Sequence, residues 1–232
     1  MKNKKAEQIA AKQKHKLQVK AKRRTEPNLD RPVAELLEKP SILIVCEGEN
    51  TEPSYFNQFR LSSATIKSVG EGYNTTSLVN RAIQLANEKQ YEQVWCVFDK
   101  DDFAEDDFNT AIQIAEAVKF KVVYSNQSFE YWLILHFDDH QGGGMHRSHY
   151  NKKINDLLKP FDVNYDGNRS KKVNEDFFEL LDGIDKKTDK KRIDLAITRA
   201  TRNFNQFDHK NPAKEESSTT VFRLVEELIK HI

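Results

Sequence analysis

The chain has 232 residues, of which 37 are Lys or Arg and 36 are Asp or Glu, giving a net charge of +1. This length suffices for one hydrophobic core with an appendage, and no apolar run approaches the roughly 20 residues that a membrane helix needs. Charge begins at Lys2 without an apolar signal region, so we expect a cytoplasmic protein without membrane association.

The positive charge is concentrated at the amino terminus. Residues 1–24 carry ten Lys or Arg and one acid, Glu7, so about +9, and the remaining chain therefore carries about −8. Such a segment is either a solvated tail or an arm that binds nucleic-acid phosphates by releasing counterions, and the sequence leaves both open. With three prolines in 25–40, residues 1–40 are predicted to be a disordered or loosely helical tail and linker.

Alternating strands and helices are predicted from residue 41 onward. Short apolar segments predict strands at 41–46, 65–69, 93–98 and 120–124. Apolar residues three and four positions apart predict helices at 51–61, 74–89 and 107–118. This order indicates an α/β fold, a Rossmann-like, mostly parallel sheet with helices on both faces.

The pattern changes beyond Ser125. An aromatic, helix-like run at 129–137 is followed by three consecutive glycines at 142–144. Further helices are predicted at 149–158, 174–181, 189–204 and 218–232. We therefore expect an α/β core over 41–137 and an all-helical part over 138–232 that packs on it. Cys46 and Cys96 lie inside apolar strands and are expected to be buried free thiols.

Carboxylates follow two of the predicted buried strands. Glu47 and Gly48 come directly after strand 41–46, and Asp99 and Asp101 follow strand 93–98. In an open parallel sheet, ligands bind beyond the carboxyl ends of the strands. Residues two apart on an extended chain project to the same side, so Asp99 and Asp101 are expected to point together toward that edge.

Three converging carboxylates repel one another unless a cation lies between them. Mg²⁺, or Mn²⁺ in its place, suits oxygen ligands and can bind a phosphate and activate water. Glu47 could exchange a proton with the reacting oxygen. The alternative is that the aspartates only cap the helix that follows.

Three ordered motifs resemble the RloB-like family. They are Ile44–Pro53 with Tyr55-Phe56, Ser125-Asn126 with Ser128–Leu133 and His136-Phe137, and Ser218–Val221 with Leu224-Val225. The resemblance extends from about residue 40 over nearly the whole remaining chain. The sequence departs from the family pattern at Gln127, where proline is expected, and in the separation of Asn211-Pro212 from Ser218-Thr219.

The resemblance implies a Toprim catalytic core. In that core Glu47 would be the general acid and base, and Asp99 and Asp101 would be Mg²⁺ ligands. The family also implies a nuclease in phage defence, abortive infection or a restriction-linked setting, commonly with an ABC-type ATPase encoded nearby.

Other polar residues near these motifs have two readings each. Glu52 is either a further metal ligand or a stabiliser of the helix amino terminus. Glu130, within an apolar run, is either a second-metal ligand or part of a buried salt bridge. Asp102 is predicted to cap a helix. Lys100 is predicted to point away from the aspartates, with a phosphate contact as the alternative reading.

The remaining candidates are basic and aromatic. Lys171 and Lys172, and the run at 186–192, are either solvated surface or contacts to a nucleic-acid backbone. The histidines at positions 136, 140, 146 and 149 lack zinc spacing. Tyr131 and Trp132 are predicted to be core residues.

The leading hypothesis is a Mg²⁺-dependent endonuclease acting on DNA or RNA, tRNA included. A non-catalytic sensor, or a subunit that docks on an ATPase, is the alternative, and a homo-oligomer is compatible with either. A phosphoryl-transfer enzyme for small nucleotides is disfavoured because the sequence has no G-x-x-x-x-G-K-[ST] phosphate loop.

Overall fold

The computed structural model describes residues 12–17, 40–68, 75–101 and 104–232. By its internal contacts the chain divides into Met1–Glu38 and Lys39–Ile232. Of the tail and linker predicted over 1–40, residues 12–17 form an exposed helix, and residues 1–11 and 18–39 lie outside the described residues. The division predicted at residue 137 stays a prediction.

Four strands form an all-parallel sheet, as the sequence predicted. They are β1 (Ile42–Cys46), β2 (Ala64–Ser68), β3 (Gln93–Lys100) and β4 (Lys121–Asn126), in the spatial order β2-β1-β3-β4. Every residue of β1 is buried, as expected for a strand with a partner on each side and helices on both faces. Cys46 at the end of β1 and Cys96 within β3 are buried free thiols.

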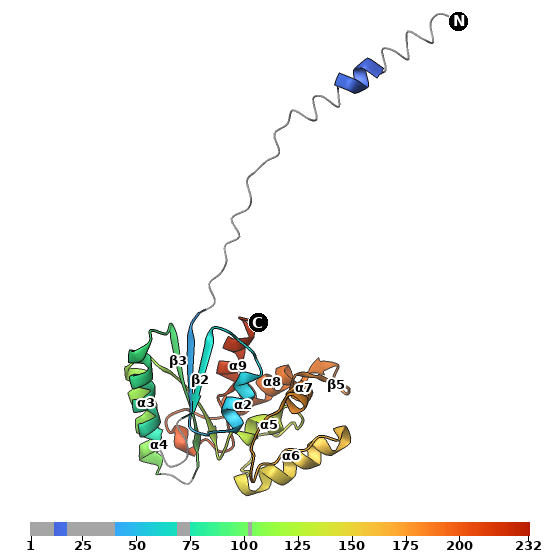
Figure 1. Ribbon diagram of the computed structural model, residues 1–232. Helices are drawn as coiled ribbons and strands as arrows, with labels where there is room; N and C mark the ends of the chain where they lie inside the picture. The colour runs from blue at the N-terminus through green and yellow to red at the C-terminus, as the bar shows by residue number, and fades with distance from the viewer. Residues whose placement is uncertain (1–11, 18–39, 69–74, 102–103) are drawn as a thin grey trace, which may run out of the picture. The chain divides into compact units, whose positions relative to one another are not determined.

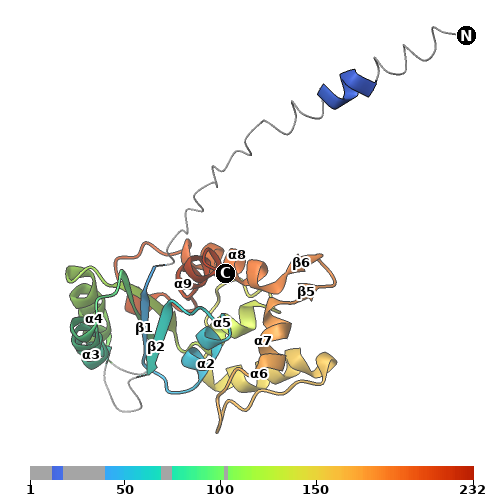
Figure 2. The same cartoon turned by 45° about the horizontal axis from the view of Figure 1, so that its top comes forward.

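Helices cover both faces of the sheet. One face carries α3 (Thr75–Glu88) and α4 (Glu105–Ala117). The other carries α2 (Thr51–Asn57), α5 (Glu130–Leu135) and α9 (Phe222–Ile229), as Figures 1 and 2 show. No helix in the described part of the chain is both long enough and apolar enough to cross a membrane.

The strand order places a topological switch point between β1 and β3. The connection after β1 leads to β2 on one side, and the connection after β3 leads to β4 on the other side. The two connections therefore leave the sheet in opposite directions. Ligands of open parallel sheets bind at such a switch point, beyond the carboxyl ends of the strands. Cys46 pairs with Val97, and this register brings the residues just after β1 beside the end of β3.

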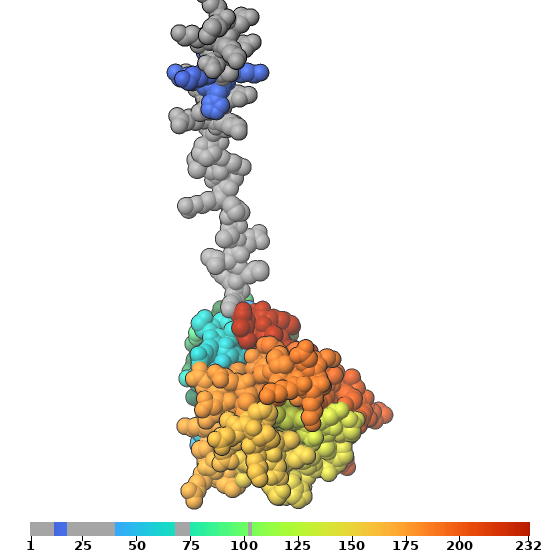
Figure 3. Space-filling view, turned by 90° about the vertical axis from the view of Figure 1, so that its right-hand side faces the viewer, coloured from blue at the N-terminus to red at the C-terminus, as the bar shows by residue number. Residues whose placement is uncertain are grey.

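The carboxy-terminal part contains α6 (Tyr150–Leu158), α7 (Glu175–Asp182) and α8 (Arg192–Phe204), with short 3₁₀ turns at Arg147–His149, Lys159–Phe161 and Pro212–Lys214. Figure 3 shows the face formed largely by α6, α7 and the segments around them, coloured yellow to orange.

The expectation of an all-helical carboxy-terminal part is wrong at two places. The first is a hairpin of β5 (Ile184–Asp185) and β6 (Lys190–Lys191), so the helix predicted from 189 begins at Arg192. The Asp185 carboxylate accepts hydrogen bonds from the Thr188 amide and hydroxyl, both at 2.9 Å. These contacts form a turn that closes the hairpin. They offer the backbone an alternative to a helix beginning at residue 189.

The second correction concerns residues 218–220, which are extended instead of helical. Thr219 forms an antiparallel bridge with Ser125. The Asn126 amide donates to the Ser218 carbonyl at 2.9 Å, and the Thr220 amide donates to the Tyr124 carbonyl at 2.8 Å. The segment therefore covers the open edge of β4, whose backbone groups would otherwise lack partners.

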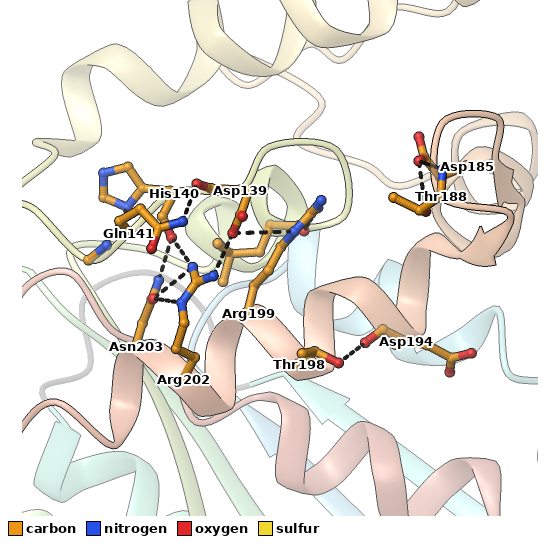
Figure 4. A network of polar contacts seen from close by, with 12 residues as sticks. Asp139, His140, Gln141, Asp185, Thr188, Asp194, Thr198, Arg199, Arg202 and Asn203 are labelled. Carbon is orange, nitrogen blue, oxygen red and sulfur yellow. Dashed lines mark hydrogen bonds and ion pairs between the residues drawn. The ribbon is translucent and has the colours of Figure 1, made fainter.

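Polar contacts attach the loop after α5 to α8 (Figure 4). Arg202 donates to the Asp139 carboxylate and to the His140 carbonyl, each at 2.7 Å. Asn203 donates to the same carbonyl and to the Tyr131 hydroxyl, each at 2.9 Å. Since α5 begins beside the acidic edge of the sheet, this network holds its distal end in place.

We predict that Thr220→Val destabilises the fold by about 1–3 kcal/mol, because the buried Tyr124 amide loses the acceptor that it contacts at 2.8 Å. Urea unfolding measures this change. Thr198→Val is the matched control, since its exposed hydroxyl contacts a carbonyl of its own helix, and we expect it to stay within roughly 0.5 kcal/mol of the parent. Equal unfolding midpoints for both variants would contradict the role of Thr220.

Candidate active site

Glu47 and Asp99 meet at the switch point between β1 and β3. The Glu47 amide donates to the Val97 carbonyl at 2.9 Å, which extends the ladder by one residue beyond β1. The Asp99 amide in turn donates to Glu47 Oε2 at 3.2 Å. The two strand-end acids that the sequence singled out are therefore brought together by strand pairing itself.

Asp99 also contacts the start of α5. Its Oδ2 accepts a hydrogen bond from the Phe129 amide at 3.1 Å. Burial raises the pKa of Asp99 well above its usual range, and the negative charges of Glu52, Glu130 and Glu47 raise it further. The protein thus disfavours the charged form of this carboxyl unless a cation offsets the repulsion.

Glu52 lies in the first turn of α2 and is only 5% exposed. A Cβ atom at Gly48 would lie 2.8 Å from Glu52 Oε1, so the absence of a side chain at Gly48 makes room for this carboxylate. Burial raises the pKa of Glu52 to about 7, while the backbone amides of Glu52 and Gly48 act in the opposite direction. Contact with these amides agrees with the helix-start reading, and the neighbouring acids keep the ligand reading open.

Glu130 joins Glu47, Glu52 and Asp99 in one acidic cluster, in which the other three charges act on Asp99. It is half-buried at the first position of α5, and its Oε1 accepts a hydrogen bond from the Tyr165 hydroxyl at 2.8 Å. The same hydroxyl lies 3.1 Å from Thr51 Oγ1. Among the described residues the hydrogen-bond partner of Glu130 is this neutral hydroxyl, so the metal-ligand and salt-bridge interpretations both stay predictions. No sequence signal pointed to Tyr165.

Asp101 lies at the rim, where Arg147 reaches it. The closest nitrogen of Arg147 is 3.6 Å from Asp101 Oδ2. Burial raises the pKa of Glu47 to about 7; the Asp99 amide lowers it, the Asp101 charge raises it and Arg147 lowers it. Sequence reasoning missed Arg147, which lies some 46 positions from Asp101 and in no recognisable motif.

The donor set of the cluster, Glu47, Glu52, Asp99 and Glu130 with Asp101 at the rim, fits a hard divalent cation by its chemistry. All five offer carboxylate oxygens, the ligands that Mg²⁺ prefers, and positive charge would relieve the repulsion that raises the pKa values of Glu52 and Asp99. Within the described residues, no three His, Cys, Asp or Glu side chains already form a set that could hold a metal ion.

The predicted basic contacts are dispersed. Lys100 donates to the Asp101 carbonyl at 2.7 Å, and Lys171 lines a cavity that also contains Glu130. Lys172 is exposed. Within 186–192, Arg192 is buried and lies over the Phe137 and Phe161 rings, so it belongs to the packing. Asp102 lies outside the described residues.

The four histidines do not gather at one place. His136 is fully buried, its Nδ1 lies 3.0 Å from the Trp132 carbonyl oxygen, and burial lowers its pKa to about 3. His140 Nδ1 lies 2.8 Å from the Tyr131 hydroxyl, while His146 caps a 3₁₀ turn and His149 is exposed. Tyr131 and Trp132 are fully buried, which confirms their prediction as core.

The family model described as RloB-like protein matches residues 42–228, from the first strand to the last helix. The chain belongs to the RloB-like family. No curated protein and no solved structure matches it. The matched range includes the whole acidic cluster and the segment that covers the β4 edge, so the family assignment confirms the resemblance carried by the three motifs.

Gln127 explains the family departure at the loop between β4 and α5. Its φ is 75°, a value that the proline ring cannot adopt. Its amide donates to the Lys100 carbonyl at 2.8 Å, and its Oε1 accepts from the Arg147 amide at 3.3 Å. In this chain, glutamine therefore connects the acidic strand end to the turn that carries Arg147.

We predict that Gln127→Pro destabilises the protein by about 3 kcal/mol or more, because the ring forbids the native φ and removes the amide donor. Gln127→Gly is the control: it keeps the amide and accepts positive φ, so thermal unfolding should place it well above the proline variant. A proline variant as stable as wild type would rule out this loop conformation.

We predict that metal-free protein loses stability as pH rises from about 4.5, the unfolded pKa of glutamate, through 7, the raised folded value of Glu52. The folded state holds the extra proton in this window, so its stabilisation is present below it and lost above it. Glu52→Gln should remove about 1–3 kcal/mol of this dependence.

Urea unfolding in EDTA at pH 5 and pH 8 measures the effect as a difference between wild type and variant. Because the Glu52 charge also raises the pKa of Asp99, this difference includes the change that the substitution causes at Asp99. Glu49→Gln, at an exposed site in the same loop, should retain the wild-type dependence. If Glu52→Gln retains it too, the raised pKa of Glu52 is wrong.

Proposed function

We propose that the chain is a Mg²⁺-dependent Toprim-type nuclease that cleaves phosphodiester bonds in nucleic acid. The observation that carries the proposal is the meeting of Glu47 and Asp99 at the switch point of the sheet, with the Asp99 amide 3.2 Å from Glu47 Oε2. Membership of the RloB-like family supports it. Repelling carboxylates held at a switch point are more useful to a metal-dependent enzyme than to an inert scaffold.

Glu47 is the residue that we assign to proton transfer. Its pKa of about 7 would let it accept a proton from the attacking water and return one to the leaving oxygen near neutral pH. Asp99 and Asp101 would hold the metal, with Glu52 and Glu130 as further oxygen donors. When bound, Mg²⁺ would stabilise the charge that develops on the phosphate.

The phosphodiester could belong to DNA or to RNA, tRNA included. By its family we place the enzyme in phage defence as an effector, with an ABC-type ATPase as partner. The rival function is a non-catalytic subunit that docks on such an ATPase. A pocket of about 480 Å³ favours that rival, because apolar surface suits protein docking. Phe178, Ile229 and Ile232 are among its lining residues, beside the charged Asp182, Lys191 and Asp194.

Cleavage by purified protein tests the proposal. We predict that Glu47→Gln and Asp99→Asn each lower the rate with Mg²⁺ or Mn²⁺ by about 100-fold or more, as expected for loss of a proton-transfer group or a metal ligand. The assay measures end-labelled DNA and RNA substrates in single-turnover conditions. Glu49→Gln, which is exposed beside the same strand end, should cut like wild type.

Calorimetry with Mg²⁺ and Mn²⁺ separates the enzyme from the docking subunit. Metal binding that disappears in Asp99→Asn, together with cutting, agrees with the nuclease. A protein that cuts neither substrate and binds neither metal, while it associates with the ATPase, would establish the rival function.

A further inference from the structure

A small polar cavity adjoins the acidic cluster. Its volume is about 140 Å³, compared with roughly 30 Å³ for one water molecule in the liquid, so it can admit a ligand group of several heavy atoms. Glu130 forms part of its wall and also belongs to the cluster around Asp99. A molecule bound at the acidic cluster could therefore extend into this cavity.

The cavity wall is rich in hydrogen-bond donors. Arg147 and Lys171 line it, against the single acid Glu130 among the described lining residues. Arg147 has five N–H donors on a planar group that suits phosphate. Asn151 adds an amide whose Oδ1 already accepts from the Gly167 amide at 3.1 Å, which leaves its Nδ2 group as the donor. The Ser148 hydroxyl already contacts His146 Nδ1 at 2.9 Å, so it is not counted among the donors.

Arg147 lies between the cavity and Asp101, at the rim of the acidic cluster. It begins the 3₁₀ turn that leads into α6, and its amide is held by Gln127 at 3.3 Å. Its side chain lies 3.6 Å from Asp101 Oδ2 and is 38% exposed. A distance of 3.6 Å is longer than a hydrogen bond between charged groups, so the guanidinium can also serve a ligand in the cavity.

We propose that this cavity binds a backbone phosphate of the nucleic acid next to the bond being cut, with Arg147 and Lys171 as the charged contacts and Asn151 as a neutral donor. This inference rests on the proposed nuclease function for its substrate. Glu130 belongs both to the cavity wall and to the acidic cluster, so the anion and cation sites lie side by side. The subsite positions the strand without taking part in the chemistry.

Oligonucleotide binding in EDTA tests the subsite independently of cleavage. Fluorescence anisotropy of full-length protein with a labelled single-stranded DNA and an RNA of the same sequence gives the Kd across a salt series. Arg147→Gln and Lys171→Gln should each raise the Kd roughly tenfold at low salt and lower the salt slope by about one. Arg147→Lys should restore the salt slope, because it keeps the charge, but only part of the affinity, because it lacks the planar donors.

Lys152→Gln is the matched control. Lys152 lies on α6 beside Asn151, but its side chain is 83% exposed and pairs with Asp156. It removes the same charge at a site outside the cavity, so its Kd and slope should stay near wild type. If Lys152→Gln weakens binding as much as Arg147→Gln and Lys171→Gln do, or if those two bind like wild type, the subsite is wrong.

Two further comparisons identify the phosphate and separate this proposal from the nuclease. Equal effects of Arg147→Gln on 5′-hydroxyl and 5′-phosphorylated strands indicate an internal phosphate, whereas an effect confined to the phosphorylated strand indicates a terminal one and overturns the backbone assignment. Binding that depends on Arg147 and Lys171 in a protein that never cuts would keep the subsite and reject the nuclease. Cutting without that dependence would do the reverse.

Discussion

The pairing of β1 with β3 is the constraint on which the candidate site depends. The Glu47 amide continues the ladder by donating to the Val97 carbonyl, and the Asp99 amide donates to Glu47 Oε2. Both contacts have a backbone amide as donor, so a register shift of one residue between these strands would break the contact with Val97 and separate the two acids. The hydrophobic pattern of these fully covered strands therefore also fixes the positions of the reactive groups.

The cost of this arrangement is electrostatic. Burial and mutual repulsion raise the pKa values of Glu47, Glu52 and Asp99, so the metal-free site holds protons that a cation would displace. The fold tolerates these carboxyls because backbone amides contact them: Phe129 contacts Asp99, and the Gly48 amide contacts Glu52. Burial of the apolar core, which includes α5, offsets the free-energy cost of holding these carboxyls together.

The sequence sufficed for the parallel sheet and for the placement of Glu47 and Asp99, because continuous apolar strands and strand-end acids are local patterns. It did not suffice for Arg147 and Tyr165, which reach the site from loops far along the chain and whose roles depend on tertiary contacts. The β5–β6 hairpin was missed because Asp185 forms a side-chain turn that outweighs helical spacing. Ser218–Thr220 reads as a helix start, yet backbone groups along β4 hold it extended.

Gln127 is a position where the sequence departs from the family pattern and where tertiary contacts fix the backbone. A family pattern with proline would fix φ near the ordinary negative value, whereas here φ is 75°, and the glutamine amide and side chain join Lys100 to Arg147. The loop between β4 and α5 thus holds the acidic strand end and the cationic turn at a set separation. Substitution in this loop would change the site through backbone geometry, even though Gln127 itself is neither charged nor a plausible metal ligand.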